Sequence, residues 1–341
     1  RANDVDFVFH QDPNFYYLSG YREPNGVVLI FSENQTDKFG NTYNELLFVQ
    51  KKDAKEELWS GKRLGVKRAK KELGFKTVFR LEDFISSSIN YKKFDKVFID
   101  GNFKDDYRNL KGIDLFDLIN HFKLKTDYNL NKTNNVDAVF LKKKLADMRE
   151  IKTAEELALL TKAVKISAIG QIEVMKAIKP FMSETELQGI HEFVYKKYDA
   201  EYEGYPSIVG AGNNGCILHY IDNNKPKIGN DLVLMDLGAE YRGYTADVTR
   251  TIPANGKFTT EQKAIYNLVY KSQEAGIKIS KVGTSFRTLN TTCFNIINEG
   301  LYALGITKSI TERHNYLPHG VSHYLGLDVH DPGTYNALRA N

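Results

Sequence analysis

The sequence predicts an α/β N-terminal domain followed by an α+β C-terminal domain. In the first part of the chain, short apolar runs alternate with charged, amphipathic stretches, whereas the second part places long amphipathic helices around one β segment. Interleaved strands and helices are typical of α/β domains, and segregated ones are typical of α+β domains. The mostly polar residues 125–135 separate the two patterns. We therefore expect domains at residues 1–135 and 145–341.

The N-terminal domain is expected to combine short strands with amphipathic helices. Its strand-sized apolar runs are Val27–Phe31, Leu46–Gln50 and Lys96–Asp100, and its helical stretches include Lys62–Leu73 and Leu115–Phe122. Lysines are frequent between residues 51 and 80, but they alternate with glutamates. This pattern indicates a solvated helix face rather than a surface for nucleic acid.

The C-terminal domain is expected to begin with two capped helices. Thr153 with Glu156, and Ser183 with Glu186, form capping boxes that bind free N–H groups of the first turn. A β segment follows at residues 231–253, and two more helices start near residues 259 and 284, the last of them stopping at Gly305. The order of elements suggests two similar halves, of which the second is unfinished.

The composition excludes several functional classes. The 341 residues are 42% apolar and 26% charged with a net charge of +4, as in a folded protein without a nucleic-acid partner. No apolar run approaches the ~20 residues of a membrane span. The two cysteines, Cys216 and Cys293, indicate a reducing, cytoplasmic location. Residue 1 is Arg rather than Met, which leaves room for an upstream signal peptide.

Residues 210–215 spell the G-x-G-x-x-G pattern of dinucleotide-binding proteins. That mechanism requires a helix whose N-terminus holds the pyrophosphate. The residues that follow, from Cys216 to Pro226, are too short and too rich in strand-forming residues for such a helix. A glycine loop between two strands is the better interpretation.

Residues 232–250 predict two strands that turn near Tyr241-Arg242. With this turn, Asp236 and Asp247 lie directly opposite each other, with Cβ atoms ~5 Å apart. Two buried carboxylates at that separation repel each other, and a bound metal ion would remove both the repulsion and the cost of burial. In the alternative, one acid faces solvent or pairs with Arg242 or Arg250, and spacing alone leaves both interpretations open.

A group of three histidines follows near the end of the chain, at His319, His323 and His330. Gly320 stands where an H-E-x-x-H zinc protease carries glutamate, so that motif is absent. A single histidine is usually a core residue, but three together, with Asp328 and Asp331 nearby, favour a functional site. His219, after the glycine loop, is weak evidence alone. The chain has no G-x-S-x-G, P-loop or C-x-x-C motif.

Five stretches of this sequence resemble the Xaa-Pro aminopeptidases (aminopeptidase P) of the pita-bread metallopeptidase superfamily. These stretches are Asp12–Gly20, Leu58–Gly65, Tyr205–Tyr220, Leu232–Pro253 and His319–Asp331. The resemblance implies a creatinase-type N-terminal domain at residues 1–135 and a pita-bread metallopeptidase domain at 145–341, incomplete at its C-terminus. It further implies release of the N-terminal residue from peptides with proline second, through a metal-bridging hydroxide.

The resemblance also implies a role for each candidate site residue. Asp236 holds one metal ion, Asp247 bridges two, and His323 completes the imidazole ligation. His219 and His330 are the catalytic candidates, since imidazoles can stabilise charge on the scissile carbonyl. His319 and Trp59 are substrate-binding residues, with Trp59 reaching a neighbouring subunit's active site in a dimer or tetramer. The family's cofactor is usually two Mn²⁺ ions, which suit oxygen ligands with one histidine.

The sequence departs from the family's pattern at the metal ligands. The family uses two further glutamates after the histidine motif, but the last glutamate here is Glu312, and the chain ends at Asn341. We interpret this as truncation at the C-terminus and expect a chain of these 341 residues to bind metal weakly and to lack turnover. Three alternatives remain: a prolidase acting on X-Pro dipeptides, an inactive pita-bread binding module, and a metal-free creatinase-like hydrolase.

Overall fold

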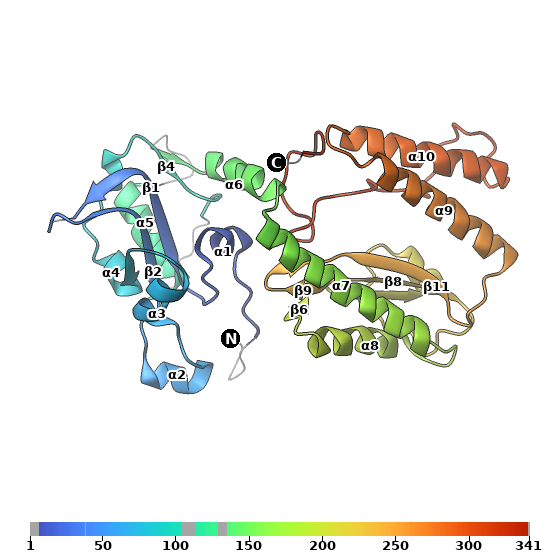
Figure 1. Ribbon diagram of the computed structural model, residues 1–341, viewed down its shortest axis with the longest axis horizontal. Coiled ribbons are helices and arrows are strands. Elements are labelled where there is room, and N and C mark those ends of the chain that lie inside the picture. The colour runs from blue at the N-terminus through green and yellow to red at the C-terminus, as the bar shows by residue number, and fades with distance from the viewer. Residues whose placement is uncertain (1–6, 38, 104–112, 129–134, 340–341) are drawn as a thin grey trace. The chain divides into compact units, whose positions relative to one another are not determined.

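The computed structural model describes residues 7–37, 39–103, 113–128 and 135–339. The chain divides into two compact units, Arg1–Leu145 and Ala146–Asn341 (Figure 1). Of the polar stretch predicted as the domain boundary, residues 129–134 lie outside the described residues.

The N-terminal unit is built around strand β2, Thr42–Val49. It pairs antiparallel with β1, Val27–Thr36, and parallel with β3, Val78–Arg80, so it is the central strand of three. A second small sheet pairs β4, Val97–Phe98, with β5, Val136–Asp137. The predicted strands at residues 27, 46 and 96 therefore correspond to β1, β2 and β4.

Helices supply two apolar cores on opposite sides of β2. They are α1 Pro13–Ser19, α2 Ala54–Ser60, α3 Gly65–Glu72, α4 Leu81–Ile85 and α5 Leu115–Thr126, with a 3₁₀ turn at Tyr91–Lys93. Leu46 and Phe48 pack with Phe84 of α4, whereas Leu47 and Val49 pack with Ala69 of α3. Successive strand residues point to opposite faces, so a strand covered on both sides is apolar throughout. This arrangement confirms the α/β class.

The C-terminal unit begins with two helices that carry the predicted caps. Thr153 caps α7, Ala154–Ala177, and Ser183 caps α8, Glu184–Lys197, each in a complete capping box. Helix α6, Phe140–Glu150, precedes them and runs across the division between the units. None of the described helices is both long enough and apolar enough to cross a membrane.

Two small antiparallel sheets lie against α7 and α8 (Figure 1). One has the order β11-β8-β7, with β7 Ile208–Ala211, β8 Leu232–Leu237 and β11 Val248–Pro253. The other has the order β10-β9-β6, with β6 Tyr202–Glu203, β9 Ala239–Tyr241 and β10 Tyr244–Thr245. Val233, Met235 and Leu237 of β8 are fully buried in the core that includes α7 and α8. The intervening residues, Leu234 and Asp236, therefore face the other side of the sheet.

The hairpin register differs from the predicted one by two residues. Arg242 and Gly243 form the turn, with φ of 54° and 86°, and Asp236 pairs with Thr249 instead of Asp247. A two-residue hairpin turn of this kind needs positive φ at both central positions, and glycine accepts it best at the second. The turn therefore centres on Arg242-Gly243, so the predicted direct opposition of Asp236 and Asp247 is wrong.

Two antiparallel helices, α9 Thr260–Ile279 and α10 Phe286–Ala303, complete the described helices of this unit (Figure 1). Thr259 caps α9 in a capping box, and Ser285, one residue after the predicted start, caps α10. Gly305 follows the last helix with a φ of 70°, as its stop position predicts. Within the described range that follows, residues 306–339 form no helix or strand of two or more residues.

Candidate metal centre and active site

Asp236 and Asp247 meet on one face of the hairpin although they are not paired. Asp236 faces Thr249, and Asp247 lies two residues before Thr249 on the same chain segment. A register change of two residues preserves the face on which a side chain lies, so the two acids are diagonal neighbours. The prediction that the hairpin brings two carboxylates together therefore holds, although its register was wrong.

Tyr205 connects the two carboxylates and was not predicted as a site residue. Its hydroxyl oxygen lies 2.6 Å from Oδ1 of Asp236 and 3.3 Å from Oδ1 of Asp247. Burial, followed by the charges of the two aspartates, raises the pKa of Tyr205, so the hydroxyl keeps its proton and donates it. A Cβ at Gly238 would lie 1.8 Å from the carbonyl oxygen of Ala246 and 2.9 Å from Cε1 of Tyr205, so only glycine lets the facing backbone and the ring approach this closely. That glycine was the available sequence signal.

The two aspartates differ in their electrostatics. Burial raises the pKa of Asp236, and the hydrogen bond from Tyr205 only partly offsets this while the charge of Asp247 adds to it. Burial also acts to raise the pKa of Asp247, but the hydrogen bond and positive charge of His323 outweigh burial and lower it. Within the part of the chain that the structure describes, Asp236 thus has no cationic partner comparable to His323, and burial disfavours its ionised form.

His323 reaches the aspartates from the irregular segment near the end of the chain. Its Nε2 lies 3.2 Å from Oδ2 of Asp247, and its Nδ1 lies 2.9 Å from the carbonyl oxygen of Tyr324. The hydrogen bond to Asp247 raises the pKa of His323. The ring of His330 stands nearly perpendicular to that of His323, with centroids 4.3 Å apart. The structure therefore brings Asp236, Asp247, His323 and His330 together.

The acids beside these histidines serve a different purpose. Asp331 is buried and accepts hydrogen bonds from Arg149 at 2.6 Å and Lys152 at 2.8 Å. Arg149 also lies 2.6 Å from Asp328. A Cβ at Gly326 would come within 2.4 Å of the Asp331 carboxyl group. Asp328 and Asp331 therefore fasten the histidine segment to the residues that precede α7.

The remaining predicted residues lie apart from this cluster. His319 is exposed, and its Nδ1 lies 2.7 Å from the carbonyl oxygen of Gly320. His219 is exposed, within the loop between β7 and β8. Within the described part of the chain, no hydrogen bond, ion pair or ring contact joins either histidine to Asp236 or Asp247. Trp59 belongs to the N-terminal unit, on α2, with 68% of its surface exposed.

The donors of the cluster suit a divalent cation. Among residues 7–37, 39–103, 113–128 and 135–339, no three His, Cys, Asp or Glu side chains converge closely enough to hold a metal ion. The carboxylates of Asp236 and Asp247 and the imidazole of His323 nevertheless form a set that hard or borderline divalent metals prefer. A cation beside Asp236 would supply the positive charge that this buried carboxylate lacks.

Comparison with protein families shows the class to which this fold and site belong. The model of metallopeptidase family M24 matches residues 158–340, and that of the aminopeptidase P N-terminal domain matches residues 1–96. The chain therefore belongs to metallopeptidase family M24. These matches confirm the fold inferred from the resemblance, an aminopeptidase P N-terminal domain followed by a pita-bread metallopeptidase domain.

Individual relatives agree with the family. The chain is 35% identical to a Xaa-Pro aminopeptidase of Haemophilus influenzae, over 98% of this chain and 74% of the relative. It is 33% identical to the Xaa-Pro aminopeptidase of Escherichia coli, over 100% of this chain and 76% of the relative. An alanine variant of Escherichia coli aminopeptidase P superposes with a TM-score of 0.84, covering 98% of this chain and 76% of that structure at 33% identity.

Proposed function

We propose that the protein is a metal-dependent aminopeptidase that releases the N-terminal residue from peptides with proline at the second position. The observation that carries the proposal is that Asp236 and Asp247 share one face of a hairpin, both in contact with Tyr205, and that His323, from near the end of the chain, lies 3.2 Å from Asp247. The relatives named Xaa-Pro aminopeptidase support the substrate class, and they favour it over a prolidase or a catalytically inactive binding module. Between the two domains, we place the boundary at residues 135–145.

Two divalent ions, most simply Mn²⁺, are the proposed cofactor. Asp236 would hold one ion, Asp247 would bridge both, and His323 would ligate the other. When bound, such ions polarise the scissile carbonyl and lower the pKa of a water molecule so that it can attack at neutral pH. The hydroxyl of Tyr205 orients the carboxylates of Asp236 and Asp247 by its two contacts.

The histidines would contact the peptide. His330 is exposed and lies next to His323, so its imidazole is positioned to donate a hydrogen bond to an oxyanion that forms at the scissile carbonyl. His219, the second catalytic candidate, would also stabilise charge on the scissile carbonyl, and His319 would bind the peptide. Trp59, exposed on α2, would contact the peptide of a neighbouring subunit in a dimer or tetramer.

Cleavage assays on the full-length enzyme test the proposed reaction. After EDTA treatment and addition of Mn²⁺, we expect release of the first residue from an X-Pro-Y tripeptide but not from the matched X-Ala-Y tripeptide. Cleavage of an X-Pro dipeptide at an equal or higher rate would identify a prolidase instead. No cleavage of any of these peptides would contradict the proposal and leave the binding module and the creatinase-like hydrolase.

Calorimetric titration with Mn²⁺ tests the ligands independently of turnover. Protons compete with metal for all three proposed ligands, so affinity should fall as the pH is lowered. His323 is one of these ligands, and its hydrogen bond to Asp247 raises its pKa from 6.5, so the fall should begin well above the range of an ordinary aspartate. Asp247→Asn should weaken binding at least about tenfold, since it removes a ligand charge. Asp199→Asn, an exposed acid on the turn after α8, is the control. Equal affinity of the Asp247 variant and the native protein would rule out the ligand assignment.

A further inference from the structure

We infer that Glu184 positions His219 by anchoring both ends of the loop that carries this histidine. The inference rests on the proposed function, in which His219 contacts the peptide. The loop spans residues 211–225, between β7 and β8, and we call it the His219 loop. It starts at Ala211, the last residue of β7, and contains a 3₁₀ turn at Gly212–Cys216; residues 217–225, all of which the structure describes, form no helix or strand.

The carboxylate of Glu184 receives four hydrogen bonds from the His219 loop. Glu184 is fully buried at the first residue of α8. One oxygen accepts from the backbone N–H of Ala211 at 2.7 Å and from the side-chain amide of Asn214 at 3.0 Å. The other accepts from the hydroxyl of Tyr220 at 2.8 Å and from the backbone N–H of Lys225 at 2.9 Å. Since Ala211 and Lys225 are the two ends of the loop, one carboxylate closes it.

Asn223 forms a second anchor on the far side of His219. It is buried and has a φ of 45°. Its side chain accepts a hydrogen bond from the backbone N–H of Val209 at 2.8 Å and donates to the carbonyl oxygen of Ser207 at 2.8 Å. It also donates to the side-chain oxygen of Gln188, in α8, at 2.9 Å. The residues after His219 are therefore held by β7 and by α8.

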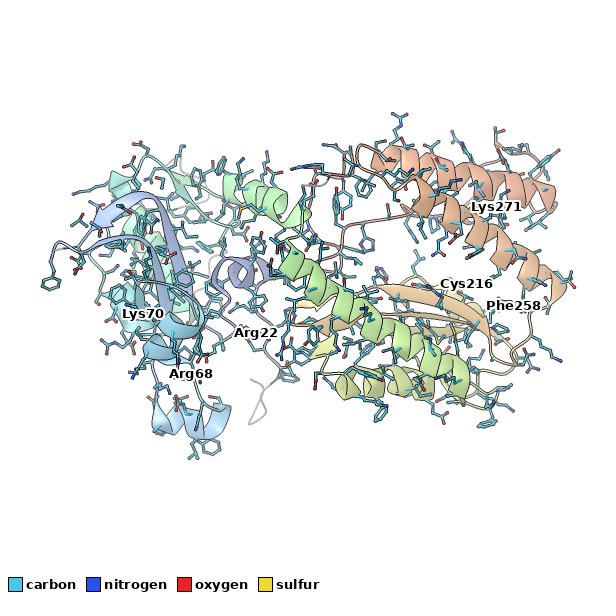
Figure 2. All side chains as sticks on the ribbon, in the orientation of Figure 1. Arg22, Arg68, Lys70, Cys216, Phe258 and Lys271 are labelled. Carbon is cyan, nitrogen blue, oxygen red and sulfur yellow. The ribbon has the colours of Figure 1, made fainter. Side chains whose placement is uncertain are left out.

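The exposed part of the loop lies between these anchors. Residues 216–219 are all exposed, and Cys216 is labelled in Figure 2. Just before them, a Cβ at Gly215 would lie 3.4 Å from Cβ of Leu234 in β8. Leu234 shares its face of β8 with Asp236. The loop thus crosses the face that bears a proposed metal ligand, and the next residue after His219 is the anchored Tyr220.

Glutamate is the residue type that this arrangement requires. Two carboxylate oxygens can each accept two hydrogen bonds, whereas glutamine would turn an NH₂ group toward one pair of donors. An N–H group facing another N–H group loses its hydrogen bond and leaves a buried donor unpaired. Glu184→Gln therefore opens one side of the anchor while preserving side-chain size. Tyr220→Phe removes one of the four donors to Glu184, together with the hydroxyl oxygen that accepts hydrogen bonds from the side-chain amide of Asn214 and the backbone N–H of Asn224.

Mobility of the loop gives the first test. Cys216 is exposed and Cys293 is buried, so a nitroxide label on the Cys293→Ala background reports on position 216, three residues before His219. We expect label mobility to increase in Glu184→Gln and in Tyr220→Phe. The control is Glu186→Gln, which removes the same charge from the same turn of α8 but bonds to Ser183 rather than to the loop. Unchanged mobility in folded Glu184→Gln and Tyr220→Phe would overturn the inference.

Kinetic coupling gives the second test, on the unlabelled full-length enzyme with an X-Pro-Y tripeptide. Glu184→Gln and Tyr220→Phe should lower kcat/KM by about tenfold, because small displacements of a positioned group are costly. On a His219→Ala background each should lower it less than about twofold, since the group that they position is absent. Equal losses on both backgrounds would overturn the positioning role. Failure of the native enzyme to cleave the tripeptide would instead contradict the proposed function, while the mobility test still reports on the anchor.

Discussion

A single hydroxyl group serves both acidic side chains of the candidate metal centre. Tyr205 lies within hydrogen-bond distance of Asp236 and Asp247, but it has one proton to donate. The shorter contact, to Asp236, gives that proton to the aspartate that lacks the histidine partner. Each carboxylate therefore has its own source of positive potential, Tyr205 for Asp236 and His323 for Asp247.

Removing that hydroxyl group should destabilise the metal-free protein. We expect Tyr205→Phe to lower the free energy of unfolding at pH 7 by about 1–3 kcal/mol, since it leaves a buried carboxylate oxygen without its donor. Urea denaturation measures the change. Tyr198→Phe is a matched control, because the structure shows no hydrogen bond of its hydroxyl among the described residues. Equal stability of the Tyr205 and Tyr198 variants would contradict the shared-hydroxyl interpretation.

At the level of helices and strands, the contact between α7 and α8 makes stability depend on pH. His191 of α8 is fully buried, its ring nitrogens have no hydrogen-bond partner among the described residues, and a Cβ at Gly170 of α7 would lie 2.6 Å from its Nδ1. Burial lowers the pKa of His191 to about 4 from an ordinary value of 6.5. Between pH 6.5 and about 4, His191 is therefore neutral in the folded protein, whereas it is protonated in the unfolded chain.

The sign of this pH effect follows from the proton balance. Between pH 6.5 and 4 the unfolded chain binds the proton and the folded chain does not, so stability present above pH 6.5 is lost as the pH falls. The lost stability amounts to about 3 kcal/mol, from 1.36 kcal/mol per pKa unit. His191→Leu should remove this pH-dependent contribution. The free energy of unfolding, measured in urea, should therefore fall less steeply between pH 6.5 and 4 in the variant than in the native protein. Parallel pH profiles would show that His191 has the same pKa in the folded and unfolded chains and would contradict this interpretation.

The turn at Arg242-Gly243 should be sensitive to its second residue. Gly243 has a φ of 86°, which residues with a Cβ adopt at a cost of about 1–2 kcal/mol. We therefore expect Gly243→Ala to lower the melting temperature. Gly189→Ala in α8 provides the contrast, because a Cβ there meets nothing within 4 Å and alanine favours helix by roughly 0.5–1 kcal/mol, so it should raise the melting temperature. A shift in the same direction for both would refute this account.

Local sequence signals predicted the elements better than their pairing. The caps at Thr153 and Ser183 were correct because a capping box depends on residues within one turn. The hairpin register was wrong by two residues, since it depends on which residue pair accepts positive φ in the turn. Helix α2, Ala54–Ser60, lies in the lysine-rich stretch whose pattern indicated a solvated helix face, and it exposes nearly all of its side chains, although its bounds were not predicted.

At the scale of the whole C-terminal unit, ion pairs connect the segment around Asp331 to the residues that begin the unit. Asp331 is buried against Arg149 and Lys152, which precede α7, and the adjacent His330 contacts His323. No local pattern predicts such contacts, because the partners lie far apart in the sequence. The histidine motif could therefore be recognised by resemblance, whereas the role of Asp331 in fastening it required the structure.

Breaking this long-range connection should cost more than losing an exposed ion pair. Asp331→Asn leaves buried cationic groups without their partner, and we expect a loss of about 3 kcal/mol in the free energy of unfolding. Asp328→Asn is the matched control, since the Asp328 side chain is 46% exposed and should cost about 1 kcal/mol or less. Denaturation of both variants in urea measures the difference, and equal losses would show that burial of Asp331 contributes nothing.

The position of β2 between two apolar cores affects how the N-terminal unit unfolds. Leu46 and Phe48 belong to one core, and Leu47 and Val49 belong to the other. Either core can hold β2 in place, so this strand should unfold only when both cores have opened. The two apolar cores should therefore unfold together in one cooperative step. In heavy water, the backbone amides of residues 46–49 should be the last of this unit to take up deuterium, because only opening of both sides exposes them.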